Sequence, residues 1–399
     1  MPPPGAHLLA LLLLIQTPDD PLAEALKLLD AHQPAQAEPL LRKAIAADPA
    51  DLAAHFNLAL SLTLQQKDPE AAAEYRRTLE LKPGLYEADL NLGILLLRDH
   101  QPADALAVLK EATDQRPKEA RPALYYAQAL LDSGDAAEAE KHFEPLTDQL
   151  PQARLGLARA LLAQSKLPEA AVQFRAAQDK NGLLQIAALY EKQGDTSAAI
   201  AIYKDFPDDP AIRERLGRLQ VDLNDALAAI PNLEDAVRRN PTTANRLALA
   251  DAFRLAKQPA KMLEQLQLAA AADVSNFELR MAFGRALRDN HSLTQAAQQF
   301  FAAAKLRPDS VPAWNELANV LIVSENYPAG LDALDHIRAL KAETPGDLFF
   351  RAITLDKLKR RPEAIAAYQQ FLSTDAGAHP DQEFQARQRI RIISSELKK

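Results

Sequence analysis

The 399-residue sequence contains no cysteine, only 12 glycines and a single tryptophan. Without cysteine the chain can form no disulfide, bind no metal through thiolates and use no thiol as a nucleophile. Few glycines beside many alanines and leucines are typical of an all-helical chain. Basic residues are also in the minority, 46 against 54 acidic residues, and the net charge is −8. Because phosphate binding depends on clustered Lys and Arg, this balance argues against a nucleic-acid partner.

Motifs for catalysis are missing as well. The sequence has no H-E-x-x-H pair, no glycine-rich phosphate loop and no G-x-S-x-G nucleophile turn. Three of its eight histidines, His32, His100 and His291, fall in predicted turns far apart along the chain, and His55 occupies a position where packing is expected. No pair has metal-ligand spacing. We therefore expect neither a metal nor a cofactor, and no enzymatic activity.

A period of 34 residues is the dominant feature of the sequence. Prolines and alanines recur at this interval through the first half of the chain. The prolines are Pro49, Pro83, Pro117 and Pro151, and the alanines are Ala37, Ala71, Ala105 and Ala139. A repeat of this length predicts one small structural unit that is copied and stacked.

Within one period, the segment from Tyr86 to Glu119 predicts two helices. Leu92 and Leu96 belong to the apolar stripe of the first helix, and Ala105 and Leu109 to that of the second. The four residues 99–102 lie between the two stripes and end in a proline. A proline inside a helix removes a backbone hydrogen bond, so this segment predicts a break between two helices. Gly93 lies where the two antiparallel helices would approach closely, so only a small residue fits there.

The small residue in the first helix, the alanine after the turn and the proline near the end resemble the tetratricopeptide repeat (TPR). This resemblance covers nearly the whole chain. It implies an all-α fold, a right-handed α-solenoid of eleven helix-turn-helix repeats with a C-terminal capping helix. The residues that open the second helices are Ala37, Ala71, Ala105, Ala139, Ala170, Ala199, Ala229, Met262, Ala296, Gly330 and Ala364.

The spacing of these marker residues predicts how the chain is organised. It is 34 residues at first, falls to between 29 and 33 in the middle and then returns to 34. We expect a change of superhelical curvature in the irregular middle. The expected segments are residues 1–17 (signal peptide or N-terminal helix), 18–153 (repeats 1–4), 154–242 (irregular repeats 5–7), 243–378 (repeats 8–11) and 379–399 (capping helix).

Two terminal segments lie outside the repeats. The apolar run Leu8–Ile15 is too short to span a bilayer and resembles the hydrophobic part of a secretory signal. It predicts that the protein is exported to the periplasm or secreted, and that it acts in a bacterial cell envelope. The alternative is a helix that packs on the first repeat of a cytoplasmic protein. At the other end, residues 381–399 predict a helix with the apolar stripe Phe384, Ile390, Ile393 and Leu397. Capping is one interpretation of this helix, and a basic docking helix is the other.

In TPR proteins the first helix of each repeat lines a concave face that binds peptides, so the resemblance implies a binding site. Asn57 and Asn91 occupy the same position in consecutive repeats, where an amide could both donate to and accept from a peptide backbone. The alternative is that asparagine is simply common at this position. The expected groove residues are Phe56, Asn57, Leu60, Leu90, Asn91, Ile94, Arg98, Arg121 and Gln128, and a second patch comprises Arg285, Arg288, Asn315 and Asn319.

These features favour a non-catalytic scaffold that binds a peptide or protein segment in the concave groove. Two alternatives stay open: a structural solenoid that self-associates into a homo-oligomer, and a regulatory subunit of an enzyme complex. We expect no transmembrane segment, since no apolar run is long enough.

Overall fold

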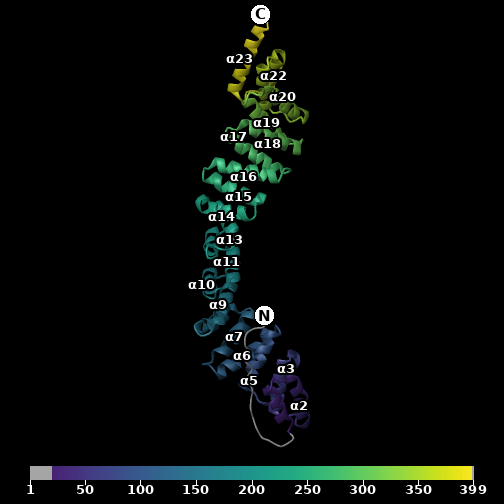
Figure 1. Cartoon of the computed structure of the whole chain (residues 1–399), viewed down its shortest axis with the longest axis vertical. Coiled ribbons are helices and arrows are strands. Elements are labelled where there is room, and N and C mark those ends of the chain that lie inside the picture. Colours follow the sequence, from purple (N-terminus) through teal and green to yellow (C-terminus); the bar gives the residue numbers. More distant parts are fainter. Residues whose placement is uncertain (1–19, 398–399) are drawn as a thin grey trace. The chain divides into compact units, whose positions relative to one another are not determined.

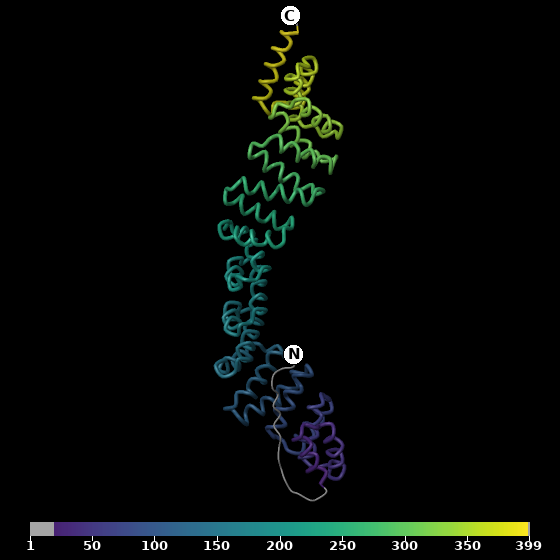
Figure 2. The backbone as a smooth tube through the Cα atoms, viewed as in Figure 1, coloured from purple at the N-terminus to yellow at the C-terminus, as the bar shows by residue number. Residues whose placement is uncertain are grey.

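A computed structural model of the chain describes residues 20–397. In this range the chain forms 23 α-helices and one short 3-10 helix, and no residue of it lies in a β-strand. Within each of the chain's two compact units, successive helices pack against one another as antiparallel neighbours (Figures 1 and 2). The all-α helical-hairpin fold expected from the sequence is confirmed.

The chain divides into two compact units, the first ending at Gly194 and the second beginning at Asp195. This division falls inside the segment 154–242, where the marker spacing is irregular. The helices of the first unit are α1 (Pro21–Asp30), α2 (Pro34–Ala47), α3 (Leu52–Leu64), α4 (Asp68–Leu81), α5 (Tyr86–Arg98), α6 (Pro102–Gln115), α7 (Ala120–Asp132), α8 (Ala136–Phe143), η1 (Glu144–Leu146), α9 (Pro151–Ala163), α10 (Leu167–Ala176) and α11 (Lys180–Gln193).

The second unit continues the same alternation. Its helices are α12 (Thr196–Tyr203), α13 (Pro210–Asp222), α14 (Ala226–Arg239), α15 (Thr243–Leu255), α16 (Pro259–Ala272), α17 (Phe277–Asp289), α18 (Leu293–Leu306), α19 (Val311–Val323), α20 (Tyr327–Ala339), α21 (Pro345–Lys357), α22 (Arg361–Asp375) and α23 (Pro380–Glu396). Odd-numbered helices up to α21 are the first helices of the repeats, and even-numbered ones are the second helices.

Each first helix ends in the same kind of turn. The residue that follows its C-cap, or at α11 the C-cap residue Gly194 itself, has left-handed backbone geometry, with φ between 55° at Lys257 and 92° at Gly134. In the turn between α5 and α6, the amide of Gln101 donates to the carbonyl of Leu96 over 2.8 Å, which closes the helix end. These residues are His32, Gln66, His100, Gly134, Ser165, Gly194, Asn224, Lys257, His291, Glu325 and Lys359. The predicted turn positions of the three histidines are therefore confirmed.

The close approach of paired helices is visible at Gly93. A Cβ atom placed on this glycine would lie 2.3 Å from Leu109 of α6, and Ala105 at the start of α6 is fully buried. The same contact recurs in the second unit, where a Cβ on Gly284 would lie 2.6 Å from Phe300. Small residues are needed at these points because the facing side chain occupies the space of a Cβ.

His55 and Trp314 occupy equivalent positions in the first helices of their repeats. The Trp314 indole N–H donates to the carbonyl of Pro308 over 2.9 Å. The His55 Nε2 atom lies 3.2 Å from the equivalent carbonyl of Pro49, and its Nδ1 lies 2.6 Å from a Glu74 carboxylate oxygen. Both rings are buried, so the packing role predicted for His55 is confirmed.

Shorter second helices explain the irregular marker spacing. The second helices α2, α4 and α6 each have 14 residues, whereas α8 and α12 have 8 residues and α10 has 10. The loss of about one helical turn per repeat shortens the interval between markers by a few residues.

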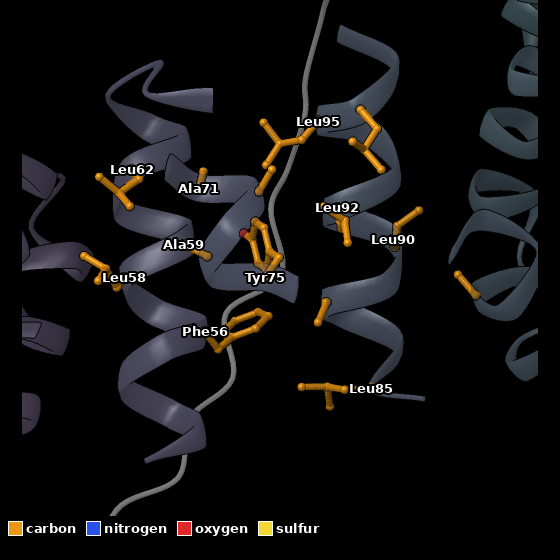
Figure 3. Close-up of a cluster of buried hydrophobic side chains, with 14 of the residues drawn as sticks. Phe56, Leu58, Ala59, Leu62, Ala71, Tyr75, Leu85, Leu90, Leu92 and Leu95 are labelled. Carbon is orange, nitrogen blue, oxygen red and sulfur yellow. The ribbon is translucent and has the colours of Figure 1, made fainter. Parts of the chain in front are cut away.

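The core runs between neighbouring helices within each unit. In the first unit, Phe56 of α3 and Tyr75 of α4 point toward each other (Figure 3), with ring centroids 5.7 Å apart and planes at 71°. Leu90 and Leu92 of α5 belong to the same buried cluster. Such an edge-to-face contact favours one arrangement of the two helices of a repeat.

The C-terminal helix α23 packs on α22, but not through the whole apolar stripe expected from the sequence. Its buried side is formed by Glu383, Ala386 and Ile393, with Ile390 half-buried, while Phe384 is 64% exposed and Leu397 50% exposed. The predicted stripe was therefore wrong at both ends. Phe384 and Ile393 are nine residues apart, which places them about 180° apart around a helix.

Among the described helices, none is long and apolar enough to cross a membrane. The run Leu8–Ile15, on which the prediction of export depends, lies outside the described residues.

Candidate functional site

The apolar residues expected in the groove are buried. Phe56 and Leu90 are fully buried, Leu60 is 5% exposed, and Ile94 is half-buried against the core of the first unit. The expectation that these side chains form an exposed apolar surface is therefore corrected for the first three. Their aromatic and aliphatic groups contribute to packing between neighbouring helices, as the contact between Phe56 of α3 and Tyr75 of α4 shows.

Asn57 and Asn91 are buried too, although the sequence favoured exposed amides. The Asn57 side-chain N–H donates to the carbonyl of Ala53 over 2.8 Å, and that of Asn91 donates to the Tyr75 hydroxyl over 3.2 Å. Among the described residues, no donor reaches the Oδ1 atom of either side chain. Asn91 thus joins α5 to α4 of the preceding repeat, which is a structural contact.

The charged and polar members of this predicted groove lie in separate contacts. Arg98 forms a bidentate ion pair with the Asp68 carboxylate of α4, and its Nε atom donates over 2.6 Å. Gln128 donates to Asp132 one turn later in α7 over 2.7 Å. The Arg121 guanidinium lies 6.0 Å from the centre of the Tyr125 ring. These residues are held by neighbours in their own or the adjacent repeat.

The second predicted patch is brought together by ion pairs. Arg285 and Arg288 of α17 both contact the Glu316 carboxylate of α19; the Arg285 Nε atom lies 3.2 Å from it. Asn319 lies one helical turn after Glu316 and is exposed, whereas Asn315 is half-buried. The Asn315 Oδ1 atom is buried and accepts no hydrogen bond from the described residues. We call Arg285, Arg288, Glu316 and Asn319 the α17–α19 surface.

A pocket of about 490 Å³ adjoins this surface. Arg285 is shared between the two, and Met262 of α16 and Ala282 of α17 form part of the apolar wall. The remaining lining residues are Arg254, Pro259, Ala286, Asp289 and Asn290. The sequence showed Met262 only as a departure from the usual alanine. Nothing in the sequence indicated that α16 and α17 leave a pocket beside it.

Among the carboxyl groups of the first unit, Asp89 and Glu38 have the largest pKa shifts. Burial raises the pKa of Asp89 to about 6, opposed by a hydrogen bond from Gln115. The hydrogen bond from Lys67 is the main cause that lowers the pKa of Glu38 to about 2, with further bonds from Arg42 and Gln65. Burial accounts for the raised pKa of Asp89, and the hydrogen bonds from Lys67, Arg42 and Gln65 account for the lowered pKa of Glu38. Neither carboxyl therefore needs a catalytic role to explain its shift.

Residues 20–397 hold no group of three or more His, Asp or Glu side chains placed to bind a metal ion.

Comparisons with known proteins were made for both sequence and structure. A tetratricopeptide-repeat family model matches residues 22–86, 127–183 and 281–347, and a second one matches residues 96–153. No curated protein sequence matches the chain.

Several solved structures are similar to parts or most of the chain. One chain in the structure of Naa15/Naa10 bound to HypK-THB is 15% identical to this chain, with a TM-score of 0.40. The match covers 95% of this chain and 79% of that chain. YrrB, described as a TPR protein with an unusual peptide-binding site, is 20% identical, with coverages of 46% and 95% and a TM-score of 0.38. PilF from Pseudomonas aeruginosa is 23% identical, with coverages of 47% and 89% and a TM-score of 0.35.

The family models together match more than half of the sequence, and the helices pair and turn as the repeat requires. The chain therefore belongs to the tetratricopeptide-repeat family.

Proposed function

We propose that this protein is a non-catalytic scaffold that binds a peptide or protein segment across the α17–α19 surface and the adjoining pocket. Membership of the tetratricopeptide-repeat family supports the general role in protein interaction. The observation that carries the location is the pocket of about 490 Å³ with Arg285 at its edge.

The chemistry of this surface suits a peptide. Met262, Ala282 and Ala286 provide an apolar wall for one side chain of the ligand. Arg285 is half-exposed, with 50% of its side chain accessible, and is held in place by Glu316. Guanidinium donors that are already oriented lose less conformational entropy when they bind a carbonyl or carboxylate. The exposed Asn319 amide adds a donor and an acceptor.

The first predicted groove is a weaker candidate because its central side chains are not accessible. Phe56, Asn57 and Leu90 are fully buried, and a ligand would have to displace core residues to reach them. Arg285 and Asn319 can be reached without such a change.

Site-specific photocrosslinking tests the location. A benzoylphenylalanine placed at Asn319 should crosslink to a partner in the native host, and the crosslinked peptide can be identified by mass spectrometry. Gln298, which is exposed on the second helix α18, is the matched control position. Equal crosslinking at both positions, or none at Asn319 with a partner captured elsewhere, would contradict the proposed surface.

We propose in addition that the protein is exported, on the basis of the sequence Leu8–Ile15. Protein isolated from its host should then begin after this run on N-terminal sequencing. An intact N-terminus in the cytoplasmic fraction would show that the run is not a signal.

A further inference from the structure

A second pocket lies at the C-terminal end of the second unit, between α21, α22 and α23. It measures about 620 Å³ and shares no residue with the α17–α19 surface. Its lining residues are Phe349, Ile353, Asp356, Lys357, Lys359, Arg361, Tyr368, Phe384, Gln385, Gln388, Arg389 and Glu396. We call it the α21–α23 pocket.

Aromatic side chains dominate the apolar part of this pocket. Phe349 and Tyr368 are buried at 6% and 2% exposure, whereas Phe384 of α23 is 64% exposed. Burial raises the pKa of the Tyr368 hydroxyl well above its usual range, so this side chain adds no negative charge to the pocket. An exposed phenylalanine beside a half-open aromatic pocket can anchor a large apolar side chain of a partner.

The charges of the pocket are unbalanced. Its two carboxylates are already paired: Arg389 holds Asp356 at 2.7 and 3.0 Å, and Arg361 holds Glu396 at 2.8 Å. Lys357 and Lys359 are exposed, and no carboxylate of residues 20–397 lies within ion-pair distance of either ammonium group. The pocket is therefore positive at its rim, although the whole chain carries a net charge of −8.

From these observations we propose that the α21–α23 pocket binds an acidic peptide segment of another protein, in which one large apolar side chain is flanked by carboxylates. The apolar side chain packs against Phe384 and the aromatic floor, and the flanking carboxylates face Lys357 and Lys359. The paired Asp356 and Glu396 do not repel such a ligand as strongly as free carboxylates would, because Arg389 and Arg361 neutralise them.

The test uses the full chain and a capped synthetic peptide that carries a single Phe between runs of Asp and Glu. Binding is measured by fluorescence polarisation at low and high salt. Phe384→Ala should weaken binding about 10-fold or more, since it removes the exposed apolar anchor. The double substitution Lys357→Gln/Lys359→Gln should weaken it by about 2- to 20-fold and flatten its salt dependence.

Control variants show whether binding depends on this pocket in particular. Leu227→Ala removes another exposed apolar side chain, 81% accessible on α14, and Lys341→Gln removes another exposed lysine; neither should change binding. Arg285→Ala/Asn319→Ala should also leave it unchanged, so failure of the α17–α19 proposal would not affect this result. Thermal melts of Phe384→Ala show whether the variant stays folded, as its exposure implies.

Three outcomes would overturn the proposal. One is equal binding of a peptide whose acidic residues are replaced by Lys. Another is unchanged affinity of a folded Phe384→Ala variant for the acidic peptide. The third is a doubled molar mass of the unliganded protein in light scattering that Phe384→Ala abolishes, because the pocket would then be occupied by a second copy of this chain.

Discussion

At the scale of single residues, burial changes what a polar side chain does. Asn57, Asn91 and Asp89 lie on first helices, and each is at most 3% exposed, although the sequence predicted an accessible binding face for the two asparagines. A buried amide or carboxyl either joins two elements by a hydrogen bond or lowers the stability of the fold. Asn91 is an example of the first case, because its amide donates to Tyr75 of the preceding helix, and Asp89, whose burial raises its pKa, is an example of the second.

Asp89→Asn should stabilise the protein near neutral pH. The pKa of Asp89 is about 6 in the folded protein against an ordinary value of 3.8, so the folded state binds a proton more tightly than the unfolded state. Stability therefore falls as the pH rises from about 4 to about 6, and the ionised group destabilises the fold above that range. We expect a gain of about 1–3 kcal/mol at pH 7 and almost none at pH 4.

Urea unfolding at both pH values, followed by circular dichroism, measures this difference. Asp309→Asn, which removes an exposed carboxylate, is the control. A gain of equal size at pH 4 and pH 7 would show that the effect does not come from ionisation of Asp89.

Asn91→Ala should lower stability by about 1–2 kcal/mol, because Tyr75 loses the amide that donates to its hydroxyl. Asn57→Ala should cost less, since its amide bonds only to a carbonyl one turn earlier in the same helix. The urea midpoints of the two variants give the comparison. If both variants kept the midpoint of the parent and yet lost affinity for a partner, the asparagines would belong to a binding site after all.

At the scale of helices, the repeat depends on a few close contacts. The pairing of α5 with α6 requires Gly93, because a Cβ there would lie 2.3 Å from Leu109. Pairing also requires a turn residue in left-handed geometry, which His100 provides between these helices. A non-glycine residue costs about 1 kcal/mol or more in this conformation, and the packing of the two helices offsets that cost.

Gly93→Ala should destabilise the first unit by about 1–3 kcal/mol, since Leu109 must move to admit the methyl group. Combining it with Leu109→Ala should restore space, so the double variant should lose less than the sum of the two single variants. Denaturation curves of the three variants measure this coupling. Gly346→Ala, where the nearest atom would lie 3.6 Å away, is a matched control. If the losses of stability of the two single variants added up in the double variant, Gly93 and Leu109 would not be in close contact.

At the scale of the whole molecule, the chain consists of two units, and stability in a repeat protein is carried by contacts between neighbours. A local change should therefore spread through a few adjacent helices and stop. The ion pair and hydrogen-bond contacts that cross between repeats, such as Glu38 with Lys67 and Arg98 with Asp68, connect neighbouring repeats only.

Ala105→Leu tests this locality. Ala105 is fully buried at the start of α6, so the larger side chain should overpack the helix pair and cost about 1–3 kcal/mol. Hydrogen exchange measured by mass spectrometry should become faster in α3 to α8 and stay unchanged in α13 to α23. Faster exchange throughout both units would show that the chain unfolds as a single cooperative structure.

The sequence by itself determined the fold class and the positions of the helix pairs. The 34-residue recurrence, the small residue at Gly93 and the alanine at Ala105 report local contacts within one repeat, and every repeat meets the same neighbours. For that reason a periodic pattern is enough to predict them. The turn positions of His32, His100 and His291, and the packing role of His55, follow from the same local rule.

Only the tertiary structure decided which polar and apolar side chains remain accessible. The burial of Asn57 and Asn91 and the exposure of Phe384 depend on the angle at which one helix crosses the next, and side chains far apart in the sequence set that angle. The pocket beside Met262 and the aromatic pocket under α23 arise in the same way, from spaces that neighbouring helices leave between them. A repeat pattern records which residues recur, but the volume left between two packed helices depends on every side chain at their interface.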